Sequence, residues 1–334
     1  MIRSRIAGIG KYIPPQVVTN DDLAQRMSTT NEWIVERTGI HERHHIREGE
    51  ETVSGMAAKA ARVAMERANT TAEAIDFIIF ATLSPEYYFP GSGVLLQREL
   101  GITSSGIGCL DIRNQCSGFL YALSVADAFI RTGTYKNVLV IGAEIHSTGL
   151  DFSDAGRSVA VIFGDGAGAV VLQPTTDEKA GILTINLHAD GEYAEKLAVI
   201  GMSSSYSDRL APERIARGEY FPVMEGQFVF KLATTKMPES VREALAAAEL
   251  TPEDIDLLVP HQANLRISEM VRRAFQLPEE KVYNNIQRYG NTTAASIPAA
   301  LCEAWEEGRV KAGDLICLTA FGSGFTWGAA LLRW

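Results

Sequence analysis

The sequence predicts an α/β fold made of two similar halves, and three observations lead to that prediction. Short apolar runs alternate with helix-like patterns along the 334 residues, which is typical of mostly parallel sheets covered by helices on both faces. Residues 71–80 (TAEAIDFIIF) match residues 251–260 (TPEDIDLLVP) at a constant offset of 180 (251 − 71). A buried helix that ends at a glycine follows Cys116 and recurs after Asn291. We therefore expect duplicated βα halves.

The second repeat also indicates where one half ends and the other begins. Each copy of the buried helix spans 17 positions up to its closing glycine, Gly133 (133 − 116) or Gly308 (308 − 291). The polar residues 174–178 lie between the two copies. The sequence therefore predicts an N-terminal half, residues 1–175, that carries the cysteine, and a C-terminal half, residues 176–334.

The elements of the first half follow from apolar periodicity and capping residues. Strands are predicted from short apolar runs at residues 6–12, 75–83, 109–112, 137–143 and 169–173. Helices are predicted at residues 19–27, 31–39, 52–68 and 117–131. The last helix is apolar nearly all round, so we expect it to be buried. The histidines of residues 41–46 lack partners at ligand spacing, which favours a solvated surface over a metal site.

The second half repeats the alternation of strands and helices. Strands are predicted at residues 181–187, 255–260, 281–284, 314–319 and 326–333, and helices at residues 231–248, 266–275 and 293–306. Residues 190–222 form a long polar connection, and long ordered loops are often functional.

Composition excludes several classes of protein. A chain with 46% apolar residues, 22% charged residues and a net charge of −10 is typical of a globular protein and not of a general nucleic-acid binder. Its four cysteines, at positions 109, 116, 302 and 317, show neither disulfide-framework nor zinc-site spacing, so we expect no metal and a reducing cytoplasm. No apolar run is long enough to span a membrane, and no secretory signal is expected.

Three residues are candidates for covalent catalysis. Cys116 lies where a short strand meets the buried helix, and the N–H groups and dipole of a helix start favour a thiolate. His261 follows the strand of residues 255–260, and Asn291 opens the second copy of the buried helix. A pseudo-twofold arrangement of the halves would bring the thiol, the imidazole and the amide together. The alternatives are a buried structural cysteine and a packed histidine.

Longer motifs carry a family resemblance along most of the chain. They are CSGF from residue 116, HQANLR from residue 261, GNTTAASIP from residue 290, FGSGFTWG from residue 321, NEWIVERTGIHER from residue 31 and IFGDGAGA from residue 162. In these motifs and their order the chain resembles β-ketoacyl-(acyl carrier protein) synthase III of the thiolase superfamily. The resemblance implies a thiolase-like, layered α-β-α-β-α sandwich. It also implies a decarboxylative Claisen condensation of an acyl-CoA primer with malonyl-acyl carrier protein, which initiates fatty acid synthesis.

The resemblance assigns roles at the reacting centre. Cys116 would carry the acyl group, and the main-chain N–H groups of Cys116 and Ser323 would bind the oxyanion. The family usually has glycine at position 323, but a main-chain donor does not require it. His261 and Asn291 would donate to the malonyl thioester oxygen as the enolate forms. Phe321 would pack near the site and help to exclude water.

The resemblance also implies how the substrates are delivered, without any cofactor. Coenzyme A would be bound by Trp33, Arg37, Arg157, Gly226 and Asn264. The acidic carrier protein would meet a basic rim of Lys231, Arg266, Arg272 and Arg273; the alternative is that these residues are ordinary surface cations. The family is dimeric, and Phe89 is expected to close the acyl pocket of the partner subunit.

The chain departs from the family pattern just before the nucleophile. Arg113 stands where small residues are common, so we expect either an internal salt bridge or a site shaped for an unusual primer, such as one that bears a carboxylate. The alternative enzyme is a condensing enzyme of specialised metabolism that makes a polyketide, quinolone or long-chain ketone precursor from a non-acetyl primer. A cysteine protease would show its own motif around the cysteine, and a catalytically silent acyl-CoA binding protein would not need all three candidate residues.

Overall fold

Two sheets organise the computed structural model, which describes residues 2–208 and 210–334. The first sheet has the strand order β1 (Arg3–Tyr12), β7 (Gly166–Thr175), β6 (Val138–Glu144), β4 (Phe77–Ala81) and β5 (Gly108–Ile112). The second sheet has the order β11 (Leu257–Pro260), β12 (Leu315–Gly322), β13 (Thr326–Arg333) and β8 (Gly181–Ala189). The chain passes from one sheet to the other in the turn between Thr175 and Gly181. A division into halves at residue 175 stays a prediction.

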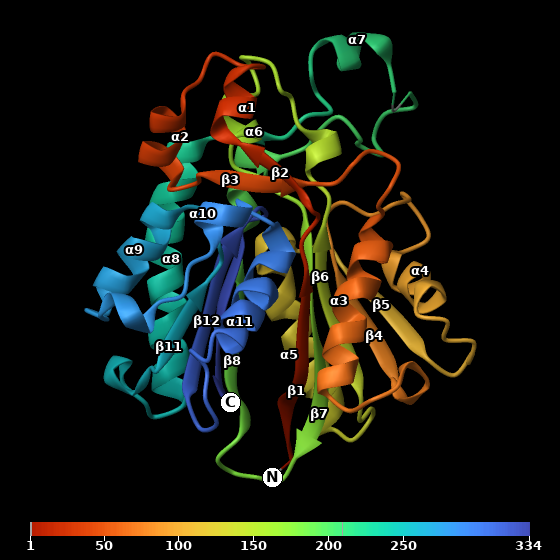
Figure 1. Ribbon diagram of the computed structural model, residues 1–334, viewed down its shortest axis with the longest axis vertical. Coiled ribbons are helices and arrows are strands. Elements are labelled where there is room, and N and C mark those ends of the chain that lie inside the picture. Colours follow the sequence, from red (N-terminus) through yellow and green to blue (C-terminus); the bar gives the residue numbers. More distant parts are fainter. Residues whose placement is uncertain (1, 209) are drawn as a thin grey trace.

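Helices form three layers around these sheets (Figure 1). The buried pair α5 (Gly118–Arg131) and α11 (Ser296–Glu306) lies between the sheets. The outer face of the first sheet is covered by α3 (Val53–Arg67) and α4 (Ser92–Glu99), and that of the second sheet by α8 (Gly226–Ala247), with α9 (Leu265–Ala274) packed on α8. The predicted layered α-β-α-β-α fold is confirmed.

The central layer is buried because both of its helices are apolar on almost every face. Phe119, Leu120 and Leu123 of α5 are fully buried, and so are Ala300 and Leu301 of α11. A helix that is apolar all round must be covered on all sides, and the two sheets provide that cover. The starts of α5 and α11 therefore meet inside the molecule and not at its surface.

Parallel pairing sets the edge at which the candidate catalytic side chains gather. Strand β4 pairs in parallel with β5 and β6, and β11 pairs in parallel with β12. The carboxyl ends of parallel strands share one edge of a sheet, where α/β proteins place their binding sites. The segments that follow β5 and β11 carry Cys116 and His261.

Shorter elements lie above this edge in Figure 1. They are α1 (Asn20–Ala24), α2 (Asn31–Thr38), α6 (Arg157–Ala160), and the paired strands β2 (Gln16–Thr19) and β3 (Glu42–His45). Thr19 and Asp22 form the capping box of α1, and Gly39 ends α2 with a φ of 77°. The connection of residues 190–222 contains the short elements η4 (Gly191–Lys196), β9 (Leu197–Ala198) and α7 (Pro212–Ala216), and β10 (Val223–Met224) follows it.

Three predictions about local structure are wrong. Residues 281–284 form no strand, because Glu279–Lys281 is a 3-10 turn and Val282 makes only an isolated bridge to Leu258. Helix α8 starts at Gly226 instead of residue 231 and continues through Pro238. The histidine segment is not fully solvated, because His45 alternates inward on β3 and is 6% exposed.

Three further observations concern the described part of the chain. It contains no group of three or more His, Cys, Asp or Glu side chains placed to hold a metal ion. None of its helices combines the length and the apolar character that a bilayer crossing would require. The four cysteines are unpaired.

Candidate active site

Cys116 lies in a tight turn between β5 and the buried helix α5. The turn is the 3-10 segment η2 (Gln115–Ser117), and the chain enters it with a φ of 43° at Gln115. Left-handed backbone is uncommon for a residue with a side chain and often marks a functional site. Cys116 is 7% exposed, and the end of β12 lies against it. A Cβ on Gly322 would be 2.6 Å from the Cβ and 3.0 Å from the Sγ of Cys116, so only glycine leaves room there.

Two main-chain donors meet the sulfur of Cys116. The N–H groups of Cys116 and Ser323 both bond to the sulfur and lower the pKa of the thiol. Burial and the nearby Glu144 carboxylate act in the opposite direction and raise that pKa to about 12. The N–H groups at the helix start therefore favour the thiolate, as expected, but they do not decide the protonation state of the resting protein. Removal of the sulfur from water outweighs the N–H groups.

His261 is held with one ring nitrogen free. Its main-chain N–H donates to the Thr319 carbonyl at 2.8 Å, and its Nδ1 lies 2.6 Å from the Ser296 Oγ. The Ser296 Oγ accepts from the Gln262 N–H at 3.4 Å, so its own proton is available to Nδ1. This favours the tautomer that carries its proton on Nε2. Nε2 is buried without a hydrogen-bond partner among the described residues, and burial lowers the pKa of His261 to about 3.

Asn291 is fixed through both its backbone and its side chain. Its N–H donates to the Ile162 carbonyl at 2.9 Å, and its carbonyl accepts from the Gly164 N–H at 3.1 Å. Its Oδ1 accepts from the Thr293 N–H at 2.8 Å. Because a main-chain N–H can only donate, this bond identifies the oxygen end of the carboxamide. The Nδ2 end is therefore the one that can donate to a substrate.

The start of α11 joins the three candidate residues. Ser296 bonds to His261 and Thr293 bonds to Asn291. A Cβ on Gly118, two residues after Cys116, would lie 3.7 Å from the Cβ of Ala294. The structure therefore gathers the three side chains around residues 293–296, where the two buried helices meet.

Glu144, at the end of β6, is a buried carboxyl that the sequence analysis missed. It accepts hydrogen bonds from the Thr82 Oγ1 at 3.1 Å, the Leu83 N–H at 3.1 Å and the Ser84 Oγ at 2.7 Å. Burial raises its pKa to about 7. The available signal was a single acidic residue at the end of an otherwise apolar run.

The residues expected to bind coenzyme A form one group. The guanidinium carbons of Arg37 and Arg157 lie 4.6 Å and 4.8 Å from the Trp33 ring centroid. Asn264 caps α9 and donates from Nδ2 to the Arg37 carbonyl at 2.9 Å. Gly226 opens α8, close to Met224, which packs in the same apolar cluster as Trp33. The structure brings these five residues to one side of the molecule.

The basic residues expected to meet the carrier protein divide into two pairs. Lys231 on α8 and Arg266 on α9 are exposed and form no ion pair within the described residues. Arg272 and Arg273 instead share Glu269, at 2.6 Å and 2.5 Å. Their positive charge is therefore partly neutralised, and they are weaker candidates than Lys231 and Arg266.

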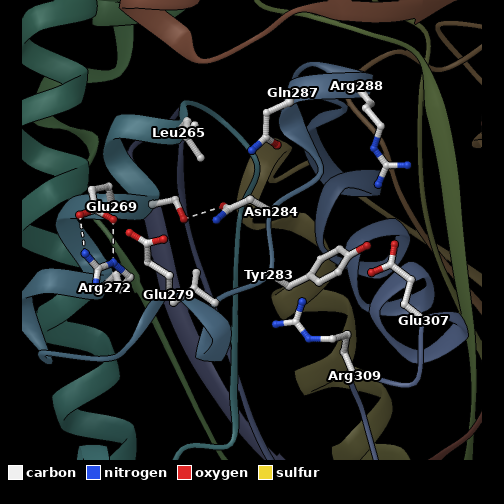
Figure 2. Close-up of a pocket in the computed structure, with 12 residues that line it drawn as sticks. Leu265, Glu269, Arg272, Glu279, Tyr283, Asn284, Gln287, Arg288, Glu307 and Arg309 are labelled. Atoms are coloured by element: carbon white, nitrogen blue, oxygen red, sulfur yellow. Dashed lines mark hydrogen bonds and ion pairs between the residues drawn. The ribbon is translucent and has the colours of Figure 1, made fainter.

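A cavity of about 500 Å³ lies beside α9 (Figure 2). The Arg272–Glu269 pair stands on one side of it, and Arg288, Glu307 and Arg309 stand on the other. Neither Cys116 nor the other two candidate catalytic residues line this cavity, so it is separate from their site.

Three remaining site residues differ in exposure. Phe321 is 4% exposed and packs on Phe325 with ring centroids 4.9 Å apart, next to Gly322 and the sulfur. Phe89 is 81% exposed. Arg113 is exposed and makes no ion pair within the described residues, so the internal salt bridge is wrong: a solvated guanidinium needs no partner.

Comparison with known proteins identifies relatives over the whole chain. The family model described as 3-oxoacyl-[acyl-carrier-protein (ACP)] synthase III matches residues 110–191, and its C-terminal counterpart matches residues 245–334. β-Ketoacyl-[acyl-carrier-protein] synthase III of Xanthomonas euvesicatoria pv. vesicatoria is 47% identical, over 100% of this chain and 99% of that protein.

Solved structures of similar proteins share the fold of this chain. 3-Oxoacyl-[acyl-carrier-protein] synthase III from Aquifex aeolicus VF5 is 45% identical, with a TM-score of 0.89 over 99% of this chain and 100% of that one. The priming β-ketosynthase of the R1128 polyketide pathway is 32% identical, with a TM-score of 0.88 over 99% of this chain and 96% of that one.

Proposed function

Because the chain belongs to the β-ketoacyl-[acyl-carrier-protein] synthase III family, we propose that it condenses an acyl-CoA primer with malonyl-acyl carrier protein. It is an acyltransferase of the condensing type. The observation that carries the proposal is the pair of main-chain N–H groups, from Cys116 and Ser323, that meet at one buried sulfur. Two N–H groups at this position can stabilise the oxyanion that forms when the sulfur attacks the carbonyl carbon of a thioester.

In the first half-reaction the Cys116 sulfur attacks the carbonyl carbon of the acyl-CoA. The negative charge that develops on the carbonyl oxygen is stabilised by the N–H groups of Cys116 and Ser323. The carbon–sulfur bond to coenzyme A then breaks, the thiol proton leaves with coenzyme A, and Cys116 holds the acyl group. Burial and Glu144 raise the pKa of the free thiol to about 12, so the resting cysteine is protonated near pH 7.

In the second half-reaction the malonyl thioester loses carbon dioxide. The electron pair of the broken carbon–carbon bond moves onto the thioester as an enolate, and its oxygen accepts hydrogen bonds from His261 Nε2 and Asn291 Nδ2. The enolate carbon then attacks the acyl-cysteine, and the sulfur of Cys116 leaves. Neutral donors suit this step, because a full positive charge would also bind the malonyl carboxylate and oppose its loss.

Substrate delivery uses the surface groups around α8 and α9. Trp33, flanked by two guanidinium groups, offers a stacking surface for a nucleobase and positive charge for phosphate. Lys231 and Arg266, which form no ion pair within the described residues, offer positive charge to an acidic carrier protein. Coenzyme A and the carrier protein enter this scheme as substrates. The unpaired cysteines support a cytoplasmic location.

A homodimer is part of the proposal, with β5 as its centre. This strand is at one edge of the first sheet and has no second strand partner among the described residues. Leu110 on this strand is 37% exposed, and Phe89 and Tyr88, which precede the neighbouring helix α4, are 81% and 56% exposed. Pairing of β5 with β5 of a second copy would cover these side chains and remove the open edge.

The test follows each half-reaction separately. Intact-mass measurement with acetyl-CoA should show one acetyl group on the wild-type protein and none on the Cys116→Ala variant. The His261→Ala and Asn291→Ala variants should take up the acetyl group but release little carbon dioxide from malonyl-acyl carrier protein. Condensation by Cys116→Ala at the wild-type rate would overturn the proposal.

The initiation of fatty acid synthesis is favoured over specialised metabolism by the identities to named relatives. Those at 45–47% are β-ketoacyl-acyl carrier protein synthases III, whereas the polyketide-priming relative is at 32%. A primer series of acetyl-, octanoyl- and glutaryl-CoA distinguishes the two roles. A strong preference for glutaryl-CoA that is lost in Arg113→Ala would point to specialised metabolism.

A further inference from the structure

The orientation of the Asn291 carboxamide depends on a strained neighbour. Thr293 donates its N–H to Asn291 Oδ1, and it does so with a φ of 51°. Left-handed backbone is strained at a β-branched residue and persists only where the surroundings hold it. Some other group must therefore keep Thr293 in this conformation.

The side chain of His146 provides that hold. Its Nε2 is hydrogen-bonded to the Thr293 Oγ1, and the residue is 8% exposed. The imidazole ring packs on Phe163 with centroids 4.5 Å apart, and the His146 N–H donates to Asp165 Oδ1 at 2.7 Å. His146 is therefore fixed through its ring and its backbone, and it can transmit that rigidity to Thr293.

Charge supports a positioning role and not a proton-transfer role. Burial lowers the pKa of His146 to about 4, against the opposing effect of Asp165, so the ring is neutral near pH 7. The charged or titratable groups that act on it are Asp165 and His45, and His146 in turn acts on His261. A neutral ring adds no positive charge beside His261.

We propose that His146 is a positioning residue for the decarboxylation step, holding Thr293 so that Asn291 presents its Nδ2 to the malonyl thioester oxygen. This inference rests on the proposed function. It predicts a selective defect, because the groups that act in the acylation of Cys116 are Cys116 in η2 and Ser323 just after β12. Within the described residues, the hydrogen bonds and ring contact of His146 go instead to Thr293, Asp165 and Phe163.

The experiment compares His146→Leu with His146→Gln in the full-length protein. Acylation of Cys116 by acetyl-CoA is measured by rapid quench and intact mass, and carbon dioxide release from malonyl-acyl carrier protein is measured separately. We expect His146→Leu to acylate within about 2-fold of wild type and to release carbon dioxide about 10- to 100-fold more slowly. Glutamine can bond to Thr293 Oγ1 through its amide, so it should recover most of the loss.

A matched control separates positioning from loss of a buried ring. His45 is similarly buried and also lies near Asp165, but its ring packs on Phe152 and not on Thr293. His45→Leu should leave the ratio of the two half-reaction rates unchanged. Thr293→Val removes the hydroxyl and keeps the side-chain shape, so it should reproduce the selective loss even if His146→Leu fails to fold.

The outcomes distinguish this inference from the proposed function. Equal losses in both half-reactions for His146→Leu and Thr293→Val, or the same ratio as in His45→Leu, would overturn the inference while the proposed function stands. Absence of carbon dioxide release by the wild-type protein would overturn the proposed function itself.

Discussion

The contact between Gly322 and Cys116 allows a sharp test of the active-site geometry. In Gly322→Ala the new Cβ would lie 2.6 Å from the Cβ of Cys116 and 3.1 Å from its main-chain nitrogen. Carbon atoms in van der Waals contact are about 3.5–4.0 Å apart, so the two segments must separate by roughly 1 Å. The displaced segment would carry with it either the sulfur or the N–H group of Ser323.

The expected effect is larger on catalysis than on stability. Overpacking a tight contact typically costs about 1–3 kcal/mol of unfolding free energy. A misplacement of about 1 Å at a reacting group costs about 100-fold in rate, which is close to 2.7 kcal/mol of barrier. The assay is the single-turnover rate of Cys116 acylation by acetyl-CoA, with the free energy of unfolding measured in parallel.

A matched glycine makes the result interpretable. A Cβ on Gly149 would meet no atom within 4 Å, and this glycine has no positive φ, so Gly149→Ala should acylate at the wild-type rate. If Gly322→Ala also acylates at the wild-type rate, the Ser323 N–H does not need its observed position. The assignment of that group to the oxyanion site would then be abandoned.

Further predictions concern protons near the site. Ser296→Ala removes the hydrogen bond to His261 Nδ1, so the ring proton is no longer held on Nε2; carbon dioxide release should slow about 10- to 100-fold while Cys116 acylation stays unchanged. Equal slowing of both steps would contradict the assignment of the tautomer. Glu144→Gln should lower the pKa of the Cys116 thiol and speed its alkylation by iodoacetamide about tenfold at pH 8. This gain should fade below about pH 7, because the wild-type Glu144 carboxyl is then protonated and no longer raises the thiol pKa. Glu303→Gln, the matched buried carboxyl, should alkylate like wild type; a pH-independent gain in Glu144→Gln would instead indicate a loosened pocket. The free energy of unfolding should fall below pH 6.5, because His261 is neutral in the folded state but becomes protonated in the unfolded chain. Between pH 7 and pH 5, urea denaturation should therefore show about 2 kcal/mol less loss of unfolding free energy for His261→Gln than for wild type. A parallel loss in both proteins would mean that His261 is not buried as described.

Much of the architecture could be predicted because it depends on patterns that are local or repeated. The all-round apolar character of residues 117–131 predicted a buried helix, and α5 lies between the two sheets. The repeat predicted that Cys116 and Asn291 stand at matching helix entrances, and both precede buried helices that start within five residues. The position of His261 directly after the strand of residues 255–260 added it to the same predicted site, independently of the resemblance.

The parts that could not be predicted depend on contacts between distant segments. The bond from His146 to Thr293 joins residues 147 positions apart, and no local pattern indicates it. The burial of His45 was hidden by polar neighbours, but β3 alternates, and Arg43 faces inward with it. Arg43 can be buried because its guanidinium donates hydrogen bonds to the carbonyl groups of Val18 and Val161.

The tendency of the Cys116 sulfur to ionise also could not be read from the sequence. A helix start predicts a lowered thiol pKa, but the balance depends on how completely water is excluded and on the charge of Glu144, which is 28 positions away (144 − 116). Both quantities arise only when β6 and β12 close around the turn. A motif predicts which residue is the nucleophile more readily than it predicts the protonation state of that residue.

The distance in sequence between Cys116 and Ser323 matters while the protein is being synthesised. The two N–H groups at the sulfur come from positions 207 residues apart (323 − 116). At about 5–20 residues per second, a ribosome needs roughly 10–40 s to travel from one to the other. During that interval the emerging cysteine lacks its second N–H partner and behaves as an ordinary thiol. Under the proposed mechanism, the growing chain therefore cannot capture an acyl group by this route before Ser323 has been added.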